Sequence, residues 1–300
     1  MTDIIKAVKK DIEDEHAAII QYLYHAYASP DEELRGKLES IARDEMRHFK
    51  WLSEWLVKSG HKPTLKRSEV ISRGDLKSLI EADVKAEEEA IRQYIYHKTL
   101  TDDDELLTLF DRIIADEKSH WEEFFKILDE LNAIPPGAEP LENQKPEEST
   151  SELTESQAAI LQQALEHEYT SILQYLYHHF TINSGEELED FAIDEMKHMG
   201  WFAETLAEKG FQPELIHSAM ESEAGPEQSV KSDLAREIDA IEKYSSAKDK
   251  FEDEEIRDLL DLAINHEKYH AESLKKMIEK YEKLSGKRFT IGSLRKETEK

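Results

Sequence analysis

Four Glu-x-x-His motifs are the residues of this sequence whose types and spacing point most directly to chemistry. A Glu and a His three positions apart lie on one face of an α-helix, so both side chains can reach the same metal ion. Two further matches, Glu13/His16 and Glu214/His217, do not recur in register with the rest of the chain and are interpreted as chance matches. The four motifs that recur in register are Glu45/His48, Glu117/His120, Glu195/His198 and Glu267/His270.

A second set of glutamates recurs in register with these motifs. The segment DIEDEHAAIIQYLYH (11–25) aligns with DVKAEEEAIRQYIYH (83–97), and its pattern returns in HEYTSILQYLYHHF (167–180). Each glutamate is followed seven positions later by a tyrosine, which places the two side chains on one helix face. The glutamates are Glu15, Glu87, Glu168 and Glu237, and the tyrosines are Tyr22, Tyr94, Tyr175 and Tyr244.

Each half of the chain therefore offers four carboxylates and two imidazoles. Four carboxylates balance the charge of two divalent cations, so such a cluster can be buried, whereas the same groups buried without metal would be strongly penalised. This donor set suits iron or manganese, and zinc can also enter it. We predict one dinuclear site per half. The first is Glu15, Glu45, His48, Glu87, Glu117 and His120, and the second is Glu168, Glu195, His198, Glu237, Glu267 and His270.

The elements that must position these ligands are helices. Apolar residues at helical spacing predict helices over about 4–27, 32–58, 75–100 and 103–131. The first and last connections are short, whereas the polar segment 61–74 is long enough to run from one end of a bundle to the other. Short, long and short connections are typical of a four-helix bundle with one crossover.

The whole bundle pattern occurs twice. DEMRHFKWLSEWLVKSGHKPTL (44–65) matches DEMKHMGWFAETLAEKGFQPEL (194–215), and a Pro-rich, charged stretch separates the two copies. The sequence predicts an all-α protein with bundle 1 in residues 1–133, a linker in 134–151, bundle 2 in 152–285 and a tail in 286–300.

Composition excludes several classes of function. A net charge of −28 argues against nucleic acid or an anionic membrane as a partner. The absence of Cys excludes disulfides, Cys-type zinc sites, iron–sulfur and rubredoxin centres and thiol catalysis. The N-terminal MTDIIKAVKKDIEDEH lacks the apolar core of a signal peptide, and no window reaches the length of a membrane span. A cytoplasmic protein is expected.

With these motifs the sequence resembles the ferritin-like superfamily, bacterioferritin most closely and rubrerythrin next. The resemblance covers both copies and rests on the first-helix Glu with its Gln-Tyr pair and on the two Glu-x-x-His helices. It implies two tandem ferritin-like bundles whose di-iron centres oxidise Fe(II) with O2 or H2O2. It also implies that the Glu of each Glu-x-x-His bridges the metals, namely Glu45, Glu117, Glu195 and Glu267. The terminal ligands would be Glu15, Glu87, Glu168 and Glu237, each paired with a His.

The sequence departs from these families in two ways. Rubrerythrin-like enzymes carry a further Glu three residues after the third-helix ligand, where this chain has Ala90 and Ala240. This difference weakens a peroxidase interpretation. Neither copy shows the short fifth helix of many cage-forming ferritins, so a mineral-storing shell is disfavoured, and the oligomeric state stays open.

Three groups of residues beside the ligands have candidate roles. Met46 and Met196 occupy the position of the haem-ligating Met of bacterioferritin, but packing at a helix interface is favoured and haem is not expected. The four tyrosines are candidate hydrogen-bond or radical donors to the ligands, with ordinary packing as the alternative. Aspartates before three of the four bridging Glu are candidates to orient a ligand His, and the fourth equivalent is a histidine. These residues are Asp44, Asp116, Asp194 and His266.

The predicted function is oxidation of Fe(II) with O2 or H2O2 at two non-haem di-iron centres, of the ferroxidase or oxidant-scavenging type. An external electron donor would be a further partner. Two alternatives stay open at this point. One is a peroxidase- or catalase-like enzyme with two iron or two manganese ions, and the other is a metal-binding protein without turnover.

Overall fold

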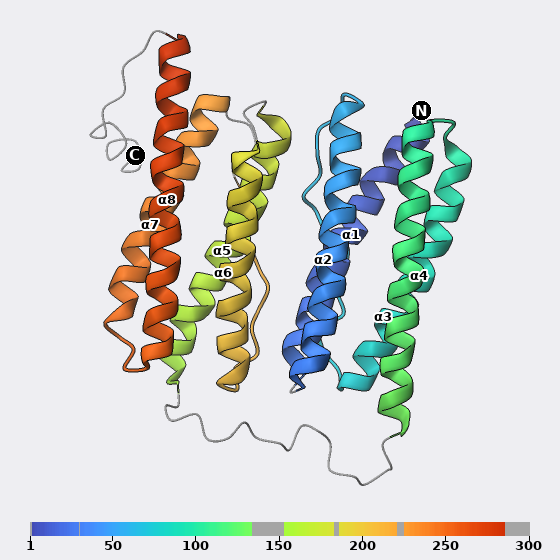
Figure 1. Ribbon diagram of the computed structural model, residues 1–300, viewed down its shortest axis with the longest axis horizontal. Coiled ribbons are helices and arrows are strands. Elements are labelled where there is room, and N and C mark those ends of the chain that lie inside the picture. Colours follow the sequence, from blue (N-terminus) through green and yellow to red (C-terminus); the bar gives the residue numbers. More distant parts are fainter. Residues whose placement is uncertain (1, 30, 134–152, 183–185, 221–224, 286–300) are drawn as a thin grey trace. The chain divides into compact units, whose positions relative to one another are not determined.

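The computed structural model describes residues 2–29, 31–133, 153–182, 186–220 and 225–285. The chain divides into two compact units, Met1–Glu148 and Ser149–Lys300 (Figure 1). The described residues form eight α-helices and one short 3-10 turn, and they contain no strand. None of these helices is both long and apolar enough to cross a membrane. The predicted linker, 134–151, and tail, 286–300, lie outside the described residues.

The first unit is a bundle of four helices with one long crossover. Its helices are α1 (Thr2–Ala28), α2 (Glu32–Lys58), α3 (Leu76–His97) and α4 (Asp104–Ala133), with the 3-10 turn at Lys98–Leu100. Helix α1 packs along α2 and α3 along α4, and contacts of α1 with α3 and of α2 with α4 close the bundle. Because the crossover spans the length of the bundle, α1 and α3 run in opposite directions (Figure 1).

The second unit repeats this arrangement. Its helices are α5 (Glu155–Thr181), α6 (Glu187–Glu208), α7 (Pro226–Lys248) and α8 (Glu254–Ser285). Helix α5 packs along α6 and α7 along α8. The predicted fold class, two tandem four-helix bundles, is therefore confirmed.

Capping residues fix where the helices begin and end, and hence the position of each predicted ligand along the bundle axis. The Asp31 side chain accepts a hydrogen bond from the Leu34 amide at the start of α2, and Asp75 accepts one from the Ser78 amide at the start of α3. Gly60 follows α2 with a φ of 82°, a left-handed conformation that favours glycine.

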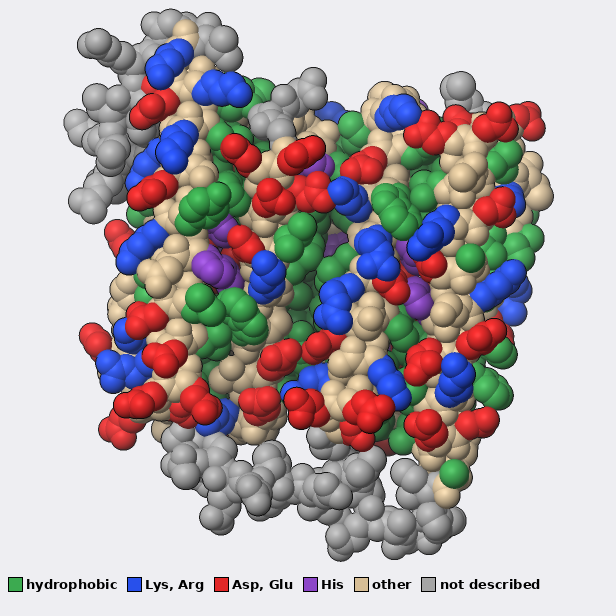
Figure 2. All heavy atoms as spheres, viewed as in Figure 1, with side chains coloured by type: hydrophobic (Ala, Val, Ile, Leu, Met, Phe, Trp, Pro, Cys, Tyr) green, Lys and Arg blue, Asp and Glu red, His purple; other side chains and the backbone are tan. Residues whose placement is uncertain are grey.

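Charged side chains lie mostly on the outside of each bundle, and apolar side chains fill its middle. On the face shown in Figure 2, acidic and basic side chains are interleaved over the outer surfaces of the helices. Apolar side chains such as Leu38, Phe110 and Phe124 are fully buried. The exception to this sorting is a layer of buried carboxylates and imidazoles within each unit, which needs a chemical explanation because buried charges are costly unless they are paired or bind metal.

Candidate metal centres

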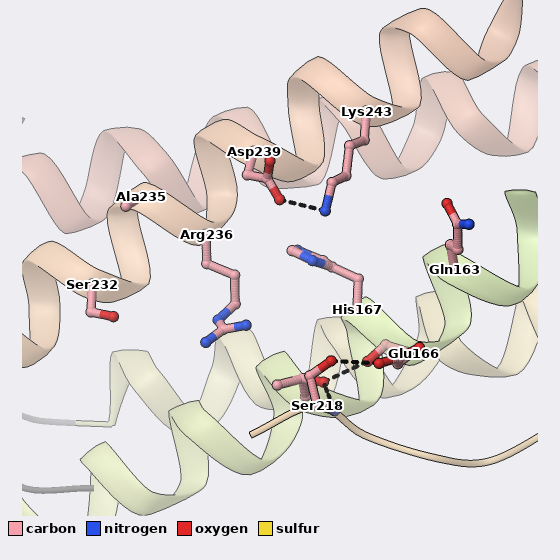
Figure 3. Close-up of a pocket in the computed structure, with 10 residues that line it drawn as sticks. Gln163, Glu166, His167, Ser218, Ser232, Ala235, Arg236, Asp239 and Lys243 are labelled. Carbon is pink, nitrogen blue, oxygen red and sulfur yellow. Dashed lines mark hydrogen bonds and ion pairs between the residues drawn. The ribbon is translucent and has the colours of Figure 1, made fainter. Parts of the chain in front are cut away.

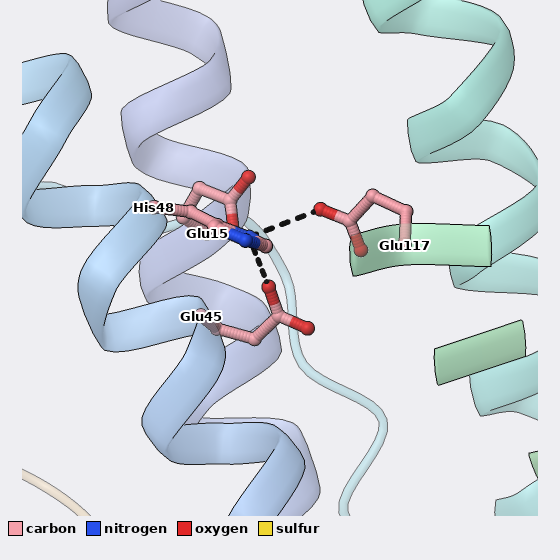
Figure 4. A group of neighbouring side chains, drawn as sticks. All are labelled: Glu15, Glu45, His48 and Glu117. Atoms are coloured by element: carbon pink, nitrogen blue, oxygen red, sulfur yellow. Dashed lines mark hydrogen bonds and ion pairs between the residues drawn. The ribbon is translucent and has the colours of Figure 1, made fainter. Parts of the chain in front are cut away.

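All six predicted ligands of the first unit meet in its core. Glu15 comes from α1, Glu87 from α3, and α2 and α4 each contribute a Glu and a His one helical turn apart. Each of these residues is at most 4% exposed. Figure 4 shows Glu15, Glu45, His48 and Glu117 converging from three helices.

Two of the glutamates face both histidines. Glu45 places Oε2 at 2.8 Å from His48 Nδ1 and Oε1 at 3.0 Å from His120 Nδ1. Glu117 places Oε1 at 3.2 Å from His48 Nδ1 and Oε2 at 3.4 Å from His120 Nδ1. Each carboxylate thus presents one oxygen to each side of the cage, which is the arrangement needed to bridge two metal ions.

The other two glutamates each face only one of the two histidines. Glu15 Oε2 lies 3.5 Å from His48 Nδ1, and Glu87 Oε1 lies 3.9 Å from His120 Nδ1. Two overlapping four-residue groups result, with ligand atoms that all lie within 4.8 Å of one another and with Glu45 and Glu117 common to both. The first unit therefore offers two adjacent metal positions.

The second unit reproduces this cage. Glu195 lies 2.8 Å from His198 Nδ1 through Oε2 and 3.3 Å from His270 Nδ1 through Oε1. Glu267 faces the same two nitrogens at 3.1 Å and 3.4 Å through its two oxygens. Glu168 lies 3.8 Å from His198, and Glu237 lies 3.6 Å from His270.

The donor atoms of these cages fit a dinuclear metal centre. Several of them are buried and face other cage atoms without forming a well-aligned hydrogen bond, which is costly unless another group satisfies them. Carboxylate oxygens with imidazole nitrogens are a donor set that iron and manganese accept. The buried atoms without a well-aligned hydrogen bond are Glu45 Oε1, His120 Nδ1, Glu168 Oε2, Glu237 Oε2, Glu267 Oε1 and His270 Nδ1.

Without metal the cages retain protons. Burial, followed by repulsion from Glu168 and Glu237, raises the pKa of Glu195 to about 7. Burial alone would lower the pKa of His120, but the facing carboxylates of Glu117 and Glu45 outweigh it and raise that pKa to about 9. Metal ions must displace these protons, because they bind carboxylates and neutral imidazoles.

The four tyrosines donate hydrogen bonds to the glutamates of α1, α3, α5 and α7. Tyr22 Oη donates to Glu87 Oε1 at 2.6 Å, and Tyr94 on α3 donates to Glu15 on α1. In the second unit Tyr175 donates to Glu237 and Tyr244 donates to Glu168. Burial, followed by the nearby carboxylates, raises the pKa of all four phenols well above the usual value, so each keeps the proton that it donates.

The outer nitrogens of the ligand histidines also have partners. Asp116 Oδ2 lies 3.4 Å from His48 Nε2, and Asp44 Oδ2 lies 3.2 Å from His120 Nε2. In the second unit Asp194 Oδ2 lies 3.4 Å from His270 Nε2. The fourth ligand, His198, meets another imidazole instead, with His266 Nδ1 at 2.9 Å from its Nε2.

The remaining sequence candidates lie outside the cages. Met46 and Met196 are half-buried beside their bridging Glu and belong to neither ligand group. The two chance matches also belong to no potential metal group among the described residues. Glu13 accepts a hydrogen bond from Thr64 Oγ1.

A buried polar layer near the cage is a feature that the sequence analysis missed. His25 Nδ1 lies 2.7 Å from Asp83 Oδ2, and His25 Nε2 lies 2.6 Å from the carbonyl oxygen of Ile71 in the crossover. Gln21 Nε2 donates to Asp83 and its Oε1 accepts from the Ile71 amide. A signal was available, because the Gln-Tyr-x-x-His pattern of QYLYH (21–25) recurs at 93–97 and 174–178.

The second unit has a cavity beside its cage that contains none of the predicted ligands. It has a volume of about 420 Å³ and opens between α5 and α7, where Figure 3 shows His167, Arg236 and Lys243 along its walls. Lys243 pairs with Asp239 at 2.7 Å. His167 on this wall directly precedes Glu168 of the cage in the chain.

Comparison with known proteins shows the family of this chain. The family model described as the ferritin-like domain matches this chain twice, over residues 5–134 and 158–284. The chain belongs to the ferritin-like family. One match falls in each unit, so each bundle is a ferritin-like domain in its own right. At the level of the family, membership and the carboxylate–histidine clusters support an iron-binding protein of the ferroxidase type.

Relatives of this ferritin-like chain include bacterioferritins. A bacterioferritin from Desulfovibrio desulfuricans is 31% identical over 124 residues, which cover 39% of this chain and 69% of the relative. Two solved structures of the bacterioferritin BfrA from Mycobacterium tuberculosis are 22% and 20% identical, with TM-scores of 0.42 and 0.41. Each covers 44% of this chain, and the match spans 86% and 87% of the respective solved chain.

Proposed function

We propose that each unit holds a non-haem di-iron centre that oxidises Fe(II) with O2 or H2O2. The observation that carries this proposal is the pair of glutamates in each cage that face both histidines, Glu45 with Glu117 and Glu195 with Glu267. A single-metal site needs no such shared ligands. Two adjacent metals suit the two-electron reduction of O2 or H2O2.

The protein's part in this reaction is to hold two metals at a fixed separation in a dry site. Bound iron would supply the chemistry, because two Fe(II) lose one electron each. O2 would take up these two electrons and two protons to give H2O2. If H2O2 is the oxidant, it would take up two electrons and two protons to give two waters. Glu15 and Glu87 complete one side each, and their carboxylates are held by the opposite tyrosines. Phe110 and Phe124 pack against these tyrosines and exclude water.

Two alternative functions follow from the same cages. A peroxidase- or catalase-like enzyme could use two iron or two manganese ions, because the donor set accepts both metals. Ala90 and Ala240, where a rubrerythrin-like enzyme has a further Glu, favour the ferroxidase type over this one. A metal-binding protein without turnover would use the same ligands without consuming an oxidant.

Metal analysis and oxidant consumption separate these functions. Protein purified from its native source should contain iron, and the Fe(II)-loaded chain should consume O2 or H2O2 in proportion to the iron added. Manganese in the native protein with peroxide turnover would favour the peroxidase- or catalase-like enzyme. Tight metal uptake with no oxidant consumption would leave only the binding role.

A further inference from the structure

The two units differ in the residue behind one of the ligand histidines. Asp116 on α4 and His266 on α8 are equivalent, because each immediately precedes a bridging glutamate, Glu117 or Glu267. Asp116 faces the outer nitrogen of His48, whereas His266 faces the outer nitrogen of His198. Three ligand histidines therefore have a carboxylate behind them, and the fourth has an imidazole.

His266 is well placed to act on His198. Its Nδ1 lies 2.9 Å from His198 Nε2, and the two rings stack with centroids 5.1 Å apart and an interplanar angle of 27°. Trp201 packs against both rings, with centroid distances of 5.4 Å to His198 and 6.2 Å to His266. This contact can orient the ligand ring at least as well as Asp116 does at 3.4 Å.

The chemical difference between the two partners is their charge. All four ligand histidines direct Nδ1 into the cage, so each must keep its proton on Nε2 and donate it outward when a metal is bound. A carboxylate acceptor adds a negative charge near the metal and makes the ligand imidazole more electron-rich. A neutral imidazole acceptor orients the ring but adds no charge.

We propose that His266 makes the metal position at His198 the weakest of the four, so that the two centres of this chain are inequivalent. This inference rests on the proposed metal centres but not on their reaction with an oxidant. The second unit then has one tight position, at His270 with Asp194 behind it, next to one weaker position.

Replacing the partner in either unit tests this inference. The full-length chain is titrated with Co(II) in the presence of a competing chelator, and the ligand-field absorption of bound Co(II) is followed. The wild-type chain should bind three equivalents tightly and a fourth about 10- to 100-fold more weakly. His266→Asp, which installs the residue of the first unit, should bring the fourth equivalent close to the others. Asp116→His should create a second weak equivalent.

A matched control separates the direct contact from charge in general. Asn265 is exposed and adjacent to His266, so Asn265→Asp adds the same charge to α8 while His266 keeps its contact with His198. This variant should titrate like the wild type. If the wild type binds four equivalents of Co(II) with equal affinity, or if Asn265→Asp and His266→Asp change the titration equally, this inference is wrong but the metal centres are unaffected. A chain that binds no Co(II) would contradict the proposed metal centres as well. Failure to consume oxidant would contradict only the proposed reaction.

Discussion

Tyr22 on α1 donates a hydrogen bond to Glu87 on α3, with Oη 2.6 Å from Oε1, although the glutamate two turns away on its own helix is Glu15. Tyr94 on α3 donates in return to Glu15. This exchange follows from the long crossover. Because α1 and α3 run in opposite directions, the Glu of each helix stands level with the Tyr of the other. The carboxylates of Glu15 and Glu87 are therefore each hydrogen-bonded by a tyrosine of the other helix.

Loss of one of these phenols should weaken the metal position that it supports. Tyr22→Phe removes the donor to Glu87 while keeping the ring that packs against Phe124, so we expect an approximately tenfold or greater loss of metal affinity at the His120 side. Competition titration with a chelator measures this loss. Tyr96→Phe, which removes a phenol that is 60% exposed on α3, the helix of Glu87, is the control and should change nothing. Equal affinities for the two variants would contradict a role of Tyr22 in holding Glu87.

Metal affinity should rise with pH through the neutral and mildly alkaline range. In the metal-free protein the pKa of Glu195 in the second unit is raised to about 7 and that of His120 in the first unit to about 9, and metal binding in each cage must displace the proton there. Protons compete with the metal below these values, and the competition weakens as the pH rises through them. Potentiometric titration should therefore show proton release on metal binding at pH 7. An affinity that is flat or falls between about pH 6 and pH 9 would contradict this linkage.

A buried Asp–His pair in the first unit predicts a non-additive pattern of stability. Asp11 is fully buried, with its carboxylate 2.9 Å from His97 Nδ1, and the second unit has Ala164 and Ala247 at the equivalent positions. His97→Ala leaves the buried Asp11 carboxylate with the Gln93 amide but without its imidazole partner, and should destabilise the first unit by about 3 kcal/mol. The Asp11→Ala/His97→Ala double variant reproduces the second unit, so it should cost less than the single variant. Denaturant unfolding followed in both variants checks the order, and a double variant that is the less stable of the two would refute it.

The ligands could be found from the sequence because they recur. The Glu of each Glu-x-x-His follows a Glu on the preceding helix by 30 residues, or by 27 in the case of Glu195 after Glu168, and helical periodicity places the Glu and His of each motif on one face. The crossover could be recognised from its length and polarity. These features are local, or repeat along the chain, and need no knowledge of how the helices contact each other.

The contacts between helices could not be found in this way. That Tyr22 meets Glu87 rather than Glu15 depends on the direction and rotation of α3, which periodicity alone does not define. The pairing of His25 with Asp83 joins residues on two helices and also a carbonyl group of the crossover. The close contact of His266 with His198 likewise appears only when α6 and α8 are packed together.

Reconstitution with iron tests the central claim most directly. The metal-free full-length chain is titrated anaerobically with Fe(II) and then exposed to O2 or H2O2, and the near-ultraviolet absorption of oxo-bridged di-iron(III) is recorded. The band should saturate at two Fe(II) per unit. Glu45→Ala and Glu195→Ala should each remove about half of the band, because each residue faces both histidines of its cage. The double variant should show no band. No band in the wild type, or an undiminished band in the double variant, would contradict the account.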